Sequence, residues 1–144
     1  MIARRISMNS LKKSNIRRLI NYLTDSQGVP ARVQEVRITG CESENAEWAA
    51  LEMQAVQKMN HRAKGDRTYH LVLSFRAEPS KEVMRQLEDI VCNKLGYGEH
   101  QRVSVVHGDT DNLHLHIAIN KIHPHKLTLH EPFYDHKTLA VLCS

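Results

Sequence analysis

The eight residues from Leu113 to Asn120 alternate so regularly that they constrain the structure around them. Leu113, Leu115, Ile117 and Ile119 fall on one side, and His114, His116, Ala118 and Asn120 fall on the other. A period of two is that of a β-strand, in which successive side chains point to opposite faces of a sheet. We therefore predict a half-buried strand here, with one face in the core and the other available for chemistry.

Three histidines lie on or beside this strand. His114 and His116 project from the same face, roughly 6 to 7 Å apart. His107 ends the preceding apolar run and is separated from the strand by a short loop rich in Asp, Asn and Gly. If the two runs pair antiparallel with His107 opposite His114, all three imidazoles share one face. Such a face could bind a divalent metal ion and leave positions open to a substrate. The alternative is a set of ordinary surface histidines on a sheet.

The remaining periodicities predict alternating strands and helices. Strands are expected at 2–8, 34–39, 68–76 and 101–106. Helices are expected after Ser14 and Ser43, which can act as their N-caps, after Ser80, and from residue 134. The order β-α-β-α-β-α-β-β places a hairpin at the centre, and the helices are long enough to cover one face of a sheet. We predict an α+β fold in which helices cover an antiparallel sheet and the His-x-His motif lies on a central strand.

The chain is basic, with a formal net charge of +4 and a pI of about 9.1. The first eighteen residues hold six of the 20 Lys and Arg side chains, namely Arg4, Arg5, Lys12, Lys13, Arg17 and Arg18. This density favours an anionic partner, for which phosphate is the obvious candidate. A solvated basic face is the alternative.

Tyr22 and Ser74 are two further candidate site residues. Tyr22 falls at the edge of the apolar stripe of its predicted helix, so its ring can pack while its hydroxyl faces a cleft. Ser74 lies beside Arg76 on the less apolar face of its predicted strand. Taken singly, Tyr22 is also explained as a ring that packs at a helix border, and Ser74 as an ordinary polar side chain at the edge of a sheet. Combined with a three-histidine cation site and a basic region, they suggest phosphoryl transfer with a tyrosine phenol as nucleophile.

The composition, 41% apolar and 25% charged, is that of a globular domain and not of a disordered chain. Cys41, Cys92 and Cys143 fit neither a disulfide framework nor a zinc knuckle and favour a reducing compartment, so we expect a cytoplasmic protein. No apolar run suits a signal peptide or a bilayer span, so no membrane insertion is expected. Because the final helical pattern is cut off, we expect residues 1–144 to be the amino-terminal part of a longer protein.

The histidine motif and its surroundings resemble a known family. His107-x-Asp109 followed by Asn112-x-His114-x-His116 and a strand ending in Asn120 is similar to the third motif of the HUH endonuclease superfamily, and specifically of MobP-class conjugative relaxases. The Tyr22 helix and the stretches 68–76, 96–104 and 120–124 resemble the TraI-type relaxases of broad-host-range plasmids, in the same order. The resemblance implies an HUH endonuclease-like fold and a DNA-nicking relaxase domain over residues 1–144.

The resemblance also implies a role for each candidate residue. Tyr22 matches the nucleophile that cleaves one DNA strand and stays joined to its 5′ phosphate, and Ser74 matches a serine that helps to hold DNA near the nick. The implied metal ligands are His107, His114 and His116, with Mg²⁺ or Mn²⁺ as the usual ion. A histidine of this motif has also been assigned proton abstraction, so His114 is expected to be a ligand, a base or both. We assign DNA contact to Arg4, Lys12, Lys13 and Arg76.

The implied function is site- and strand-specific nicking and rejoining at a plasmid origin of transfer, through a covalent 5′-phosphotyrosine, which initiates conjugative DNA transfer. The implied partners are single-stranded origin DNA, accessory relaxosome proteins and a type IV secretion coupling protein. Two alternatives stay open. One is a replication initiator or transposase of the same superfamily, and the other is a non-catalytic DNA-binding module with a structural metal ion.

Overall fold

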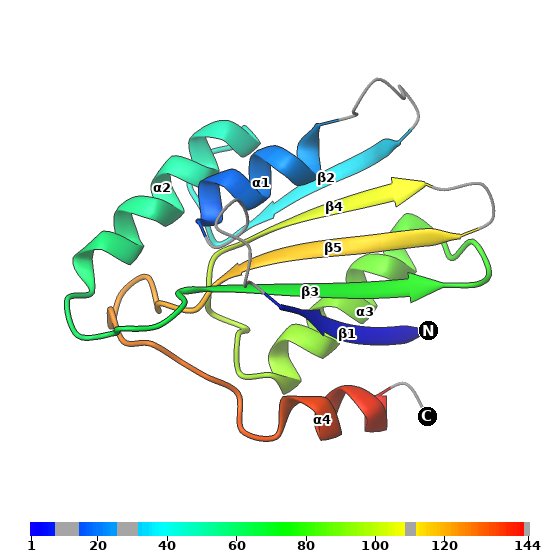
Figure 1. Ribbon diagram of the computed structural model, residues 1–144. Coiled ribbons are helices and arrows are strands. Elements are labelled where there is room, and N and C mark those ends of the chain that lie inside the picture. Colours follow the sequence, from blue (N-terminus) through cyan, green and yellow to red (C-terminus); the bar gives the residue numbers. More distant parts are fainter. Residues whose placement is uncertain (8–14, 26–31, 109–111, 143–144) are drawn as a thin grey trace.

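The computed structural model describes residues 1–7, 15–25, 32–108 and 112–142. Its elements follow the predicted order (Figure 1). The strands are β1 (Ile2–Ile6), β2 (Val33–Thr39), β3 (Thr68–Phe75), β4 (Arg102–Gly108) and β5 (Leu113–Asn120), and the helices are α1 (Ile16–Thr24), α2 (Ala46–Met59), α3 (Lys81–Lys94) and α4 (Asp135–Leu142). Two of the candidate DNA contacts, Lys12 and Lys13, lie outside the described residues.

The strands form one antiparallel sheet in the order β1-β3-β5-β4-β2. The middle strand is β5, which carries the His-x-His motif between β3 and β4. The predicted α+β fold, with this motif on a central strand, is therefore confirmed. A central strand is hydrogen-bonded along both sides, so the histidines project from the most constrained backbone of the sheet.

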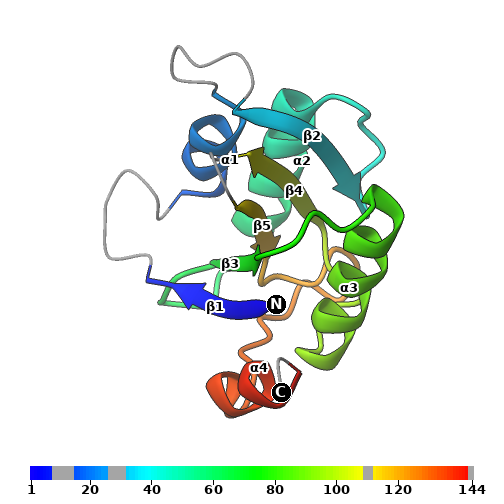
Figure 2. The ribbon, with the colours of Figure 1, turned by 90° about the vertical axis from the view of Figure 1, so that its right-hand side faces the viewer.

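Helices cover both faces of the sheet, and the expectation that they cover one face was wrong (Figure 2). On one face, α1 and α2 pack over Val103, Val105 and Ala118. On the opposite face, α3 and Leu139 of α4 pack against the leucines and isoleucines of β5. The first pair of helices finds its apolar surface on the histidine face itself, beyond the end of the His-x-His motif, because Ala118 continues that face as a small apolar side chain.

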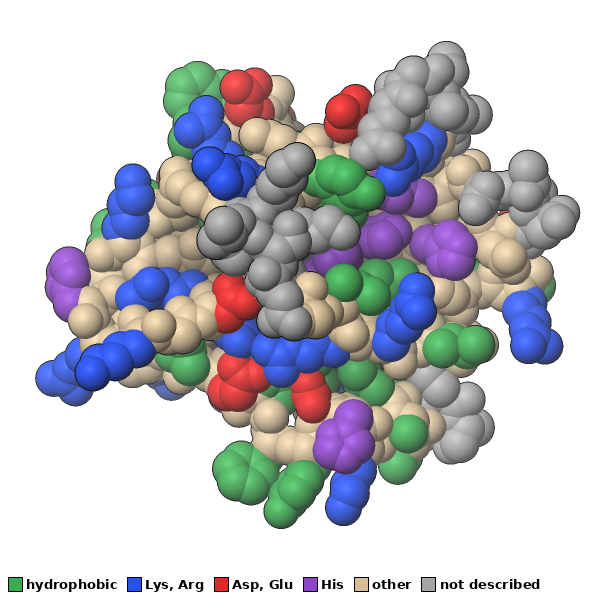
Figure 3. Space-filling model, viewed as in Figure 1, with side chains coloured by type: hydrophobic (Ala, Val, Ile, Leu, Met, Phe, Trp, Pro, Cys, Tyr) green, Lys and Arg blue, Asp and Glu red, His purple; other side chains and the backbone are tan. Residues whose placement is uncertain are grey.

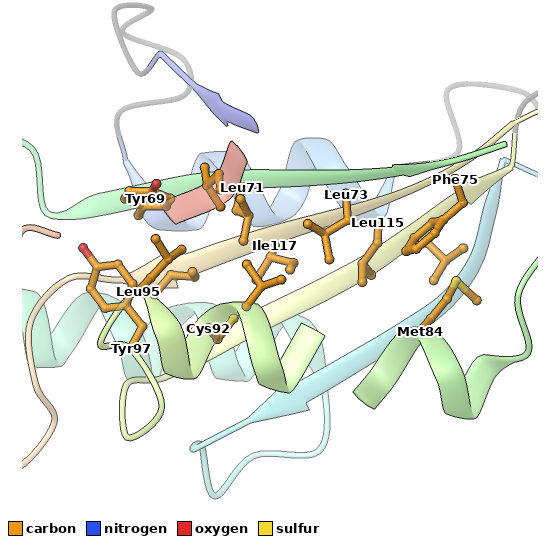
Figure 4. Close-up of a cluster of buried hydrophobic side chains, with 14 of the residues drawn as sticks. Tyr69, Leu71, Leu73, Phe75, Met84, Cys92, Leu95, Tyr97, Leu115 and Ile117 are labelled. Carbon is orange, nitrogen blue, oxygen red and sulfur yellow. The ribbon is translucent and has the colours of Figure 1, made fainter. Parts of the chain in front are cut away.

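The larger apolar core lies on the face away from the histidines (Figure 4). Its labelled members come from β3, β5, α3 and the turn that follows α3: Tyr69, Leu71, Leu73, Phe75, Met84, Cys92, Leu95, Tyr97, Leu115 and Ile117. Fully burying one Leu or Ile side chain stabilises a fold by about 1.5 to 3 kcal/mol. This layer therefore anchors β5 from behind and leaves its other face free to carry polar groups.

Helix α1 begins at Ile16 and is capped by Asn15, one residue after the expected cap Ser14, because the Asn15 side-chain oxygen accepts hydrogen bonds from the backbone N–H groups of Arg17 and Arg18. Its apolar stripe is fully buried and consists of Ile16, Leu19, Ile20 and Leu23. Tyr22 lies at the border of that stripe with 40% of its surface exposed, as its position in the sequence predicts. The helix is thus held firmly along one side while Tyr22 stays accessible.

The segment after β5 returns beneath β1 and is fixed there by charge. Arg5 donates to Glu131 at 2.7 Å and to Asp135 at 3.3 Å, and Asp135 also accepts from the Tyr69 hydroxyl at 2.9 Å. Lys121, which is almost fully buried, donates to the same Glu131. These contacts tie α4 to the sheet. In the described ranges, no helix is both long and apolar enough to span a membrane.

Candidate active site

The β4–β5 hairpin pairs His107 directly with His114. Paired residues of an antiparallel sheet project to the same face, and His116 lies two residues further along that face. The ring centroids of His107 and His116 are 4.6 Å apart, and those of His114 and His116 are 6.5 Å apart. The three imidazoles thus share one face, as the alternation predicts. Figure 3 shows histidine side chains gathered on the surface, with Lys and Arg side chains around them.

Strand β3 supplies a hydrogen-bonding partner to each histidine of β5. The Ser74 hydroxyl lies 2.9 Å from Nδ1 of His114, the residue with which it is paired. His70 reaches diagonally to His116, with 3.0 Å between His70 Nε2 and His116 Nδ1. Both contacts engage Nδ1, so these two rings are oriented by the neighbouring strand and can bind an ion only through Nε2.

His107 is held by the last turn of α1. Its Nε2 lies 2.6 Å from the backbone oxygen of Leu23, and a carbonyl can only accept, so Nε2–H is the donor. When this ring is neutral, its lone pair is on Nδ1. The same contact joins the helix to the histidine cluster at the residue next to Tyr22. The helix that carries the nucleophile candidate is therefore anchored to the metal-ligand candidates by a side-chain-to-backbone hydrogen bond.

The environment lowers the pKa of two of these imidazoles, His116 and His107. Burial, together with charge repulsion from the neighbouring His107, His70 and His114, lowers the pKa of His116 to about 3. Burial also lowers the pKa of His107, against the opposing effect of its bond to the Leu23 oxygen. A neutral imidazole is the form that binds a divalent cation.

The donor set suits a metal ion chemically, but it is not arranged around one. Among the described residues, no three His, Cys, Asp or Glu side chains are placed so that they could hold an ion together. While Nε2 of His107 donates to the Leu23 oxygen, only Nδ1 of this ring can offer a lone pair to an ion.

Tyr22 faces the solvent side of α1 beside a cation. The guanidinium of Arg32 lies 5.9 Å from the centre of the Tyr22 ring. This separation is within the range of a weak cation–π contact.

Two candidate DNA contacts border the histidine face. Arg4 of β1 is paired with Val72, which is paired in turn with His116, so Arg4 points to the histidine face from two strands away, roughly 10 Å across the sheet. Arg76 directly follows β3 and lines a cleft of about 770 Å³ together with Ser74, Asn112 and His114. Arg5 points the other way and is occupied by Glu131 and Asp135. The two arginines of β1 thus divide between a residue on the histidine face and a structural one.

Sequence reasoning missed two groups at this site. His70 lies on the same face of β3 as Ser74 but received no role, and it is now seen to be buried against His116. Its signal was available, because residues 70 and 74 of one strand share a face. The Leu23 carbonyl carries no side-chain signal, and only the packing of α1 on the sheet reveals it.

Comparison with known proteins gives a family match and several similar proteins. The family model "Relaxase: MobA/VirD2-like, nuclease domain" matches residues 22–144. Two proteins named TraI, from Escherichia coli, are 53% and 50% identical over 146 aligned residues that cover all of this chain and 20% of each relative. A protein named MobA, from Acidithiobacillus ferrooxidans, is 45% identical over 64 residues, which cover 43% of this chain and 16% of that protein. The chain thus spans about one fifth of the length of the TraI relatives.

Proposed function

This chain belongs to the MobA/VirD2-like relaxase family, and we propose that it cuts and rejoins one DNA strand at a plasmid origin of transfer, which initiates conjugative transfer. The observation that carries the proposal is the hydrogen bond from His107 to the Leu23 oxygen. It seats the end of the helix that carries Tyr22 on the cluster of three imidazoles, at the residue next to Tyr22. A nuclease domain of this family needs a nucleophile and phosphate-stabilising groups together.

In the proposed reaction the phenol oxygen of Tyr22 attacks the scissile phosphorus. A bond from that oxygen to phosphorus forms, the bond from phosphorus to the 3′ oxygen breaks, the phenol proton passes to a base, and the leaving 3′ oxygen takes up a proton. The products are a 5′-phosphotyrosine and a free 3′ hydroxyl. The new phosphodiester keeps the energy of the old one, so the reverse reaction rejoins the strand.

The proposed metal ligands are His107, His114 and His116, with Mg²⁺ or Mn²⁺ as the ion. When bound, such an ion would polarise a non-bridging phosphate oxygen and neutralise developing charge. His114 is also the proposed base, because its ring is the outer one of the three and is oriented by Ser74. One imidazole lone pair cannot bind an ion and take a proton at the same time, so these two roles of His114 are separable by experiment.

The proposed substrate is single-stranded origin DNA, contacted by Arg4 and Arg76 on the histidine face, with Lys12 and Lys13 as further contacts. Ser74 is proposed to hold DNA beside the nick as well as the ring of His114. Accessory relaxosome proteins and a type IV secretion coupling protein are the proposed partners, and the cytoplasm is the proposed compartment. The match to a relaxase nuclease model favours this function over a replication initiator, a transposase or a silent DNA-binding module.

The nucleophile is tested by trapping the covalent product. The protein is incubated with Mn²⁺ and with single-stranded oligonucleotides that tile an origin of transfer, and the products are separated on a denaturing gel. We expect a protein–DNA band from the wild-type chain and none from Tyr22→Phe, because only the phenol oxygen is removed. Tyr134→Phe is the matched control, since Tyr134 is also exposed, at 61% against 40% for Tyr22, but lies at the start of α4.

The control variant should form the band at the wild-type rate. A band from Tyr22→Phe would show that another residue is the nucleophile. Addition of EDTA should abolish the band, and persistence of cleavage in EDTA would count against the proposed metal site.

A further inference from the structure

His70 is a buried polar residue beside the proposed metal site to which neither the proposed reaction nor the family match gives a role. It is 3% exposed, its Nε2 lies 3.0 Å from Nδ1 of His116, and the two ring centroids are 5.3 Å apart. Burying an imidazole costs free energy unless its polar atoms are used. A histidine at this position therefore contributes something that an apolar side chain would not.

The contact has a counterpart one step along the same strand pair. Ser74 meets Nδ1 of His114 at 2.9 Å, just as His70 meets Nδ1 of His116. Both partners come from β3, and both imidazoles come from β5. Strand β3 therefore presents one orienting group to each histidine of the His-x-His motif, and the same ring atom is engaged in both cases.

The position of the proton on His116 decides whether His70 donates or accepts the hydrogen bond between them. An imidazole that binds a cation through Nε2 carries its proton on Nδ1. In His116 that proton would point at Nε2 of His70, which must then accept it. An accepting neighbour at Nδ1 fixes both the tautomer and the ring orientation of a ligating histidine and raises its basicity as a ligand.

We propose that His70 is a positioning residue that accepts a hydrogen bond from Nδ1–H of His116 and so aims Nε2 of His116 at a divalent cation. This inference rests on the proposed function, since it names the support of the same metal site. His70 itself touches neither the ion nor the DNA. It acts only through His116.

The test uses Mn²⁺ alone as probe, on the DNA-free protein, with the dissociation constant measured by calorimetry or by the EPR signal of unbound Mn²⁺. In His70→Gln the amide oxygen can stand near the place of Nε2, while in His70→Asn the side chain is one methylene too short. We expect His70→Asn to bind Mn²⁺ about 10- to 100-fold more weakly, and His70→Gln to stay within about threefold of the wild type. His125→Asn, at an exposed histidine outside the site, is the control and should not change the affinity.

A second readout separates positioning from general damage. Affinity for a single-stranded oligonucleotide in EDTA and the thermal unfolding midpoint should be similar for the Gln and Asn variants. If His70→Asn does not fold, His70→Leu replaces it, because an apolar side chain of similar size suits the buried position. Equal Mn²⁺ affinity in the wild type and in the folded Asn or Leu variant would overturn the proposal, and so would an equal loss in the Gln variant.

Failure of this inference and failure of the proposed function give different results. Absence of Mn²⁺ binding by the wild type would overturn both the metal site and the role of His70. If Mn²⁺ binding follows the expected Gln and Asn pattern but no covalent DNA product forms, His70 keeps its role while the nicking function is wrong. If the covalent product forms and substitutions of His70 leave the Mn²⁺ affinity unchanged, only the inference about His70 is wrong.

Discussion

At the scale of single residues, each imidazole of the cluster is held by a different partner. His107 is bound to a helix carbonyl, His114 to a serine hydroxyl and His116 to another imidazole. These partners give the rings unequal roles although the sequence presents them as equivalent. The rings of His107 and His116 lie closest together, and His114 stands further out.

This inequality leads to a prediction for alanine substitutions. We expect His116→Ala to weaken Mn²⁺ binding strongly and to slow the covalent reaction, because it removes the central ring. We expect His114→Ala to slow the covalent reaction at least as much while lowering Mn²⁺ affinity less, because His114 is the proposed base. Mn²⁺ titration and the rate of adduct formation, measured on the same two variants, give the comparison.

Cooperative thermal unfolding of both variants is the control. An equal loss of Mn²⁺ affinity in the two would show that His114 is a full ligand. Loss of cooperative unfolding in His116→Ala would instead indicate that His116 has a structural role.

The placement of these residues could be predicted where it depends on the alternation of a strand and on strand pairing. It could not be predicted where it depends on how side chains and helices pack. Alternation alone put His114 and His116 on one face. At the level of sequence, the pairing of His107 with His114 was only a condition, and the β4–β5 hairpin meets it. His70 was on the correct face, but the diagonal reach to His116 depends on side-chain directions that a sequence does not give. The bond to Leu23 requires knowing where α1 docks.

At the scale of elements, neighbouring residues of a strand point to opposite faces of the sheet and so have different roles. In β1, Arg4 points to the histidine face, while Arg5 lies over the Tyr69 ring at 4.3 Å and pairs with Glu131 and Asp135.

The start of α2 shows a different choice between two residues of the same kind. Ser43 was expected to cap this helix, but its side chain bonds Glu52, and Asn45 is the cap, because Asn45 accepts from the N–H groups of Glu47 and Trp48. The expectation failed by two residues, since both side chains are good caps and only the local backbone selects one.

The two arginines of β1 give a matched pair of variants. We expect Arg4→Ala to weaken binding of a single-stranded oligonucleotide and to reduce the slope of log affinity against log salt by about 0.7, the value for one phosphate contact on a single strand. We expect Arg5→Ala to leave that slope unchanged and to lower the unfolding midpoint, because it removes ion pairs that hold α4. Fluorescence anisotropy over a salt series measures the slope.

Arg76→Ala should behave like Arg4→Ala if its cleft beside Ser74 holds DNA. A change of slope in Arg5→Ala equal to that in Arg4→Ala would show that the face of the sheet does not decide DNA contact.

At the scale of the whole molecule, the sheet separates an apolar layer on one face from a layer on the other face that is partly apolar and partly polar. One face is filled by α3, α4 and the large core. The other is apolar under α1 and α2 and polar at the histidines. The sequence predicted the elements, their order and the central strand, because these follow from periodicity. It did not predict that helices would divide between the faces, since an apolar stripe on a helix does not reveal which side of a sheet it will cover.

The buried histidines make stability depend on pH. The pKa of His116 falls to about 3 in the folded chain, against about 6.5 in an unfolded one, and the pKa of His107 is also lowered. At a pH between these two values, the His116 imidazole is protonated in the unfolded chain and neutral in the folded chain. The free energy of unfolding therefore falls as the pH drops below about 6.5, by up to about 1.4 kcal/mol per pH unit for His116.

Urea unfolding at pH 7, 6 and 5 measures this dependence above the range in which carboxylates titrate. His116→Gln, which removes the titrating group, should flatten the slope. An unchanged slope in that variant would assign the acid sensitivity to other groups.

The strand order also sets how the molecule reaches its fold. Among the described strands, β4 and β5 are the only sequence neighbours that pair, while β1 with β3, β3 with β5 and β2 with β4 join strands separated by other elements. Closing a short loop has a small entropy cost, and distant pairings are slow to form. The hairpin that sets His107 opposite His114 can thus assemble first, and the helix that bears Tyr22 docks on it afterwards. We therefore expect the metal-ligand candidates to come together before the nucleophile candidate docks.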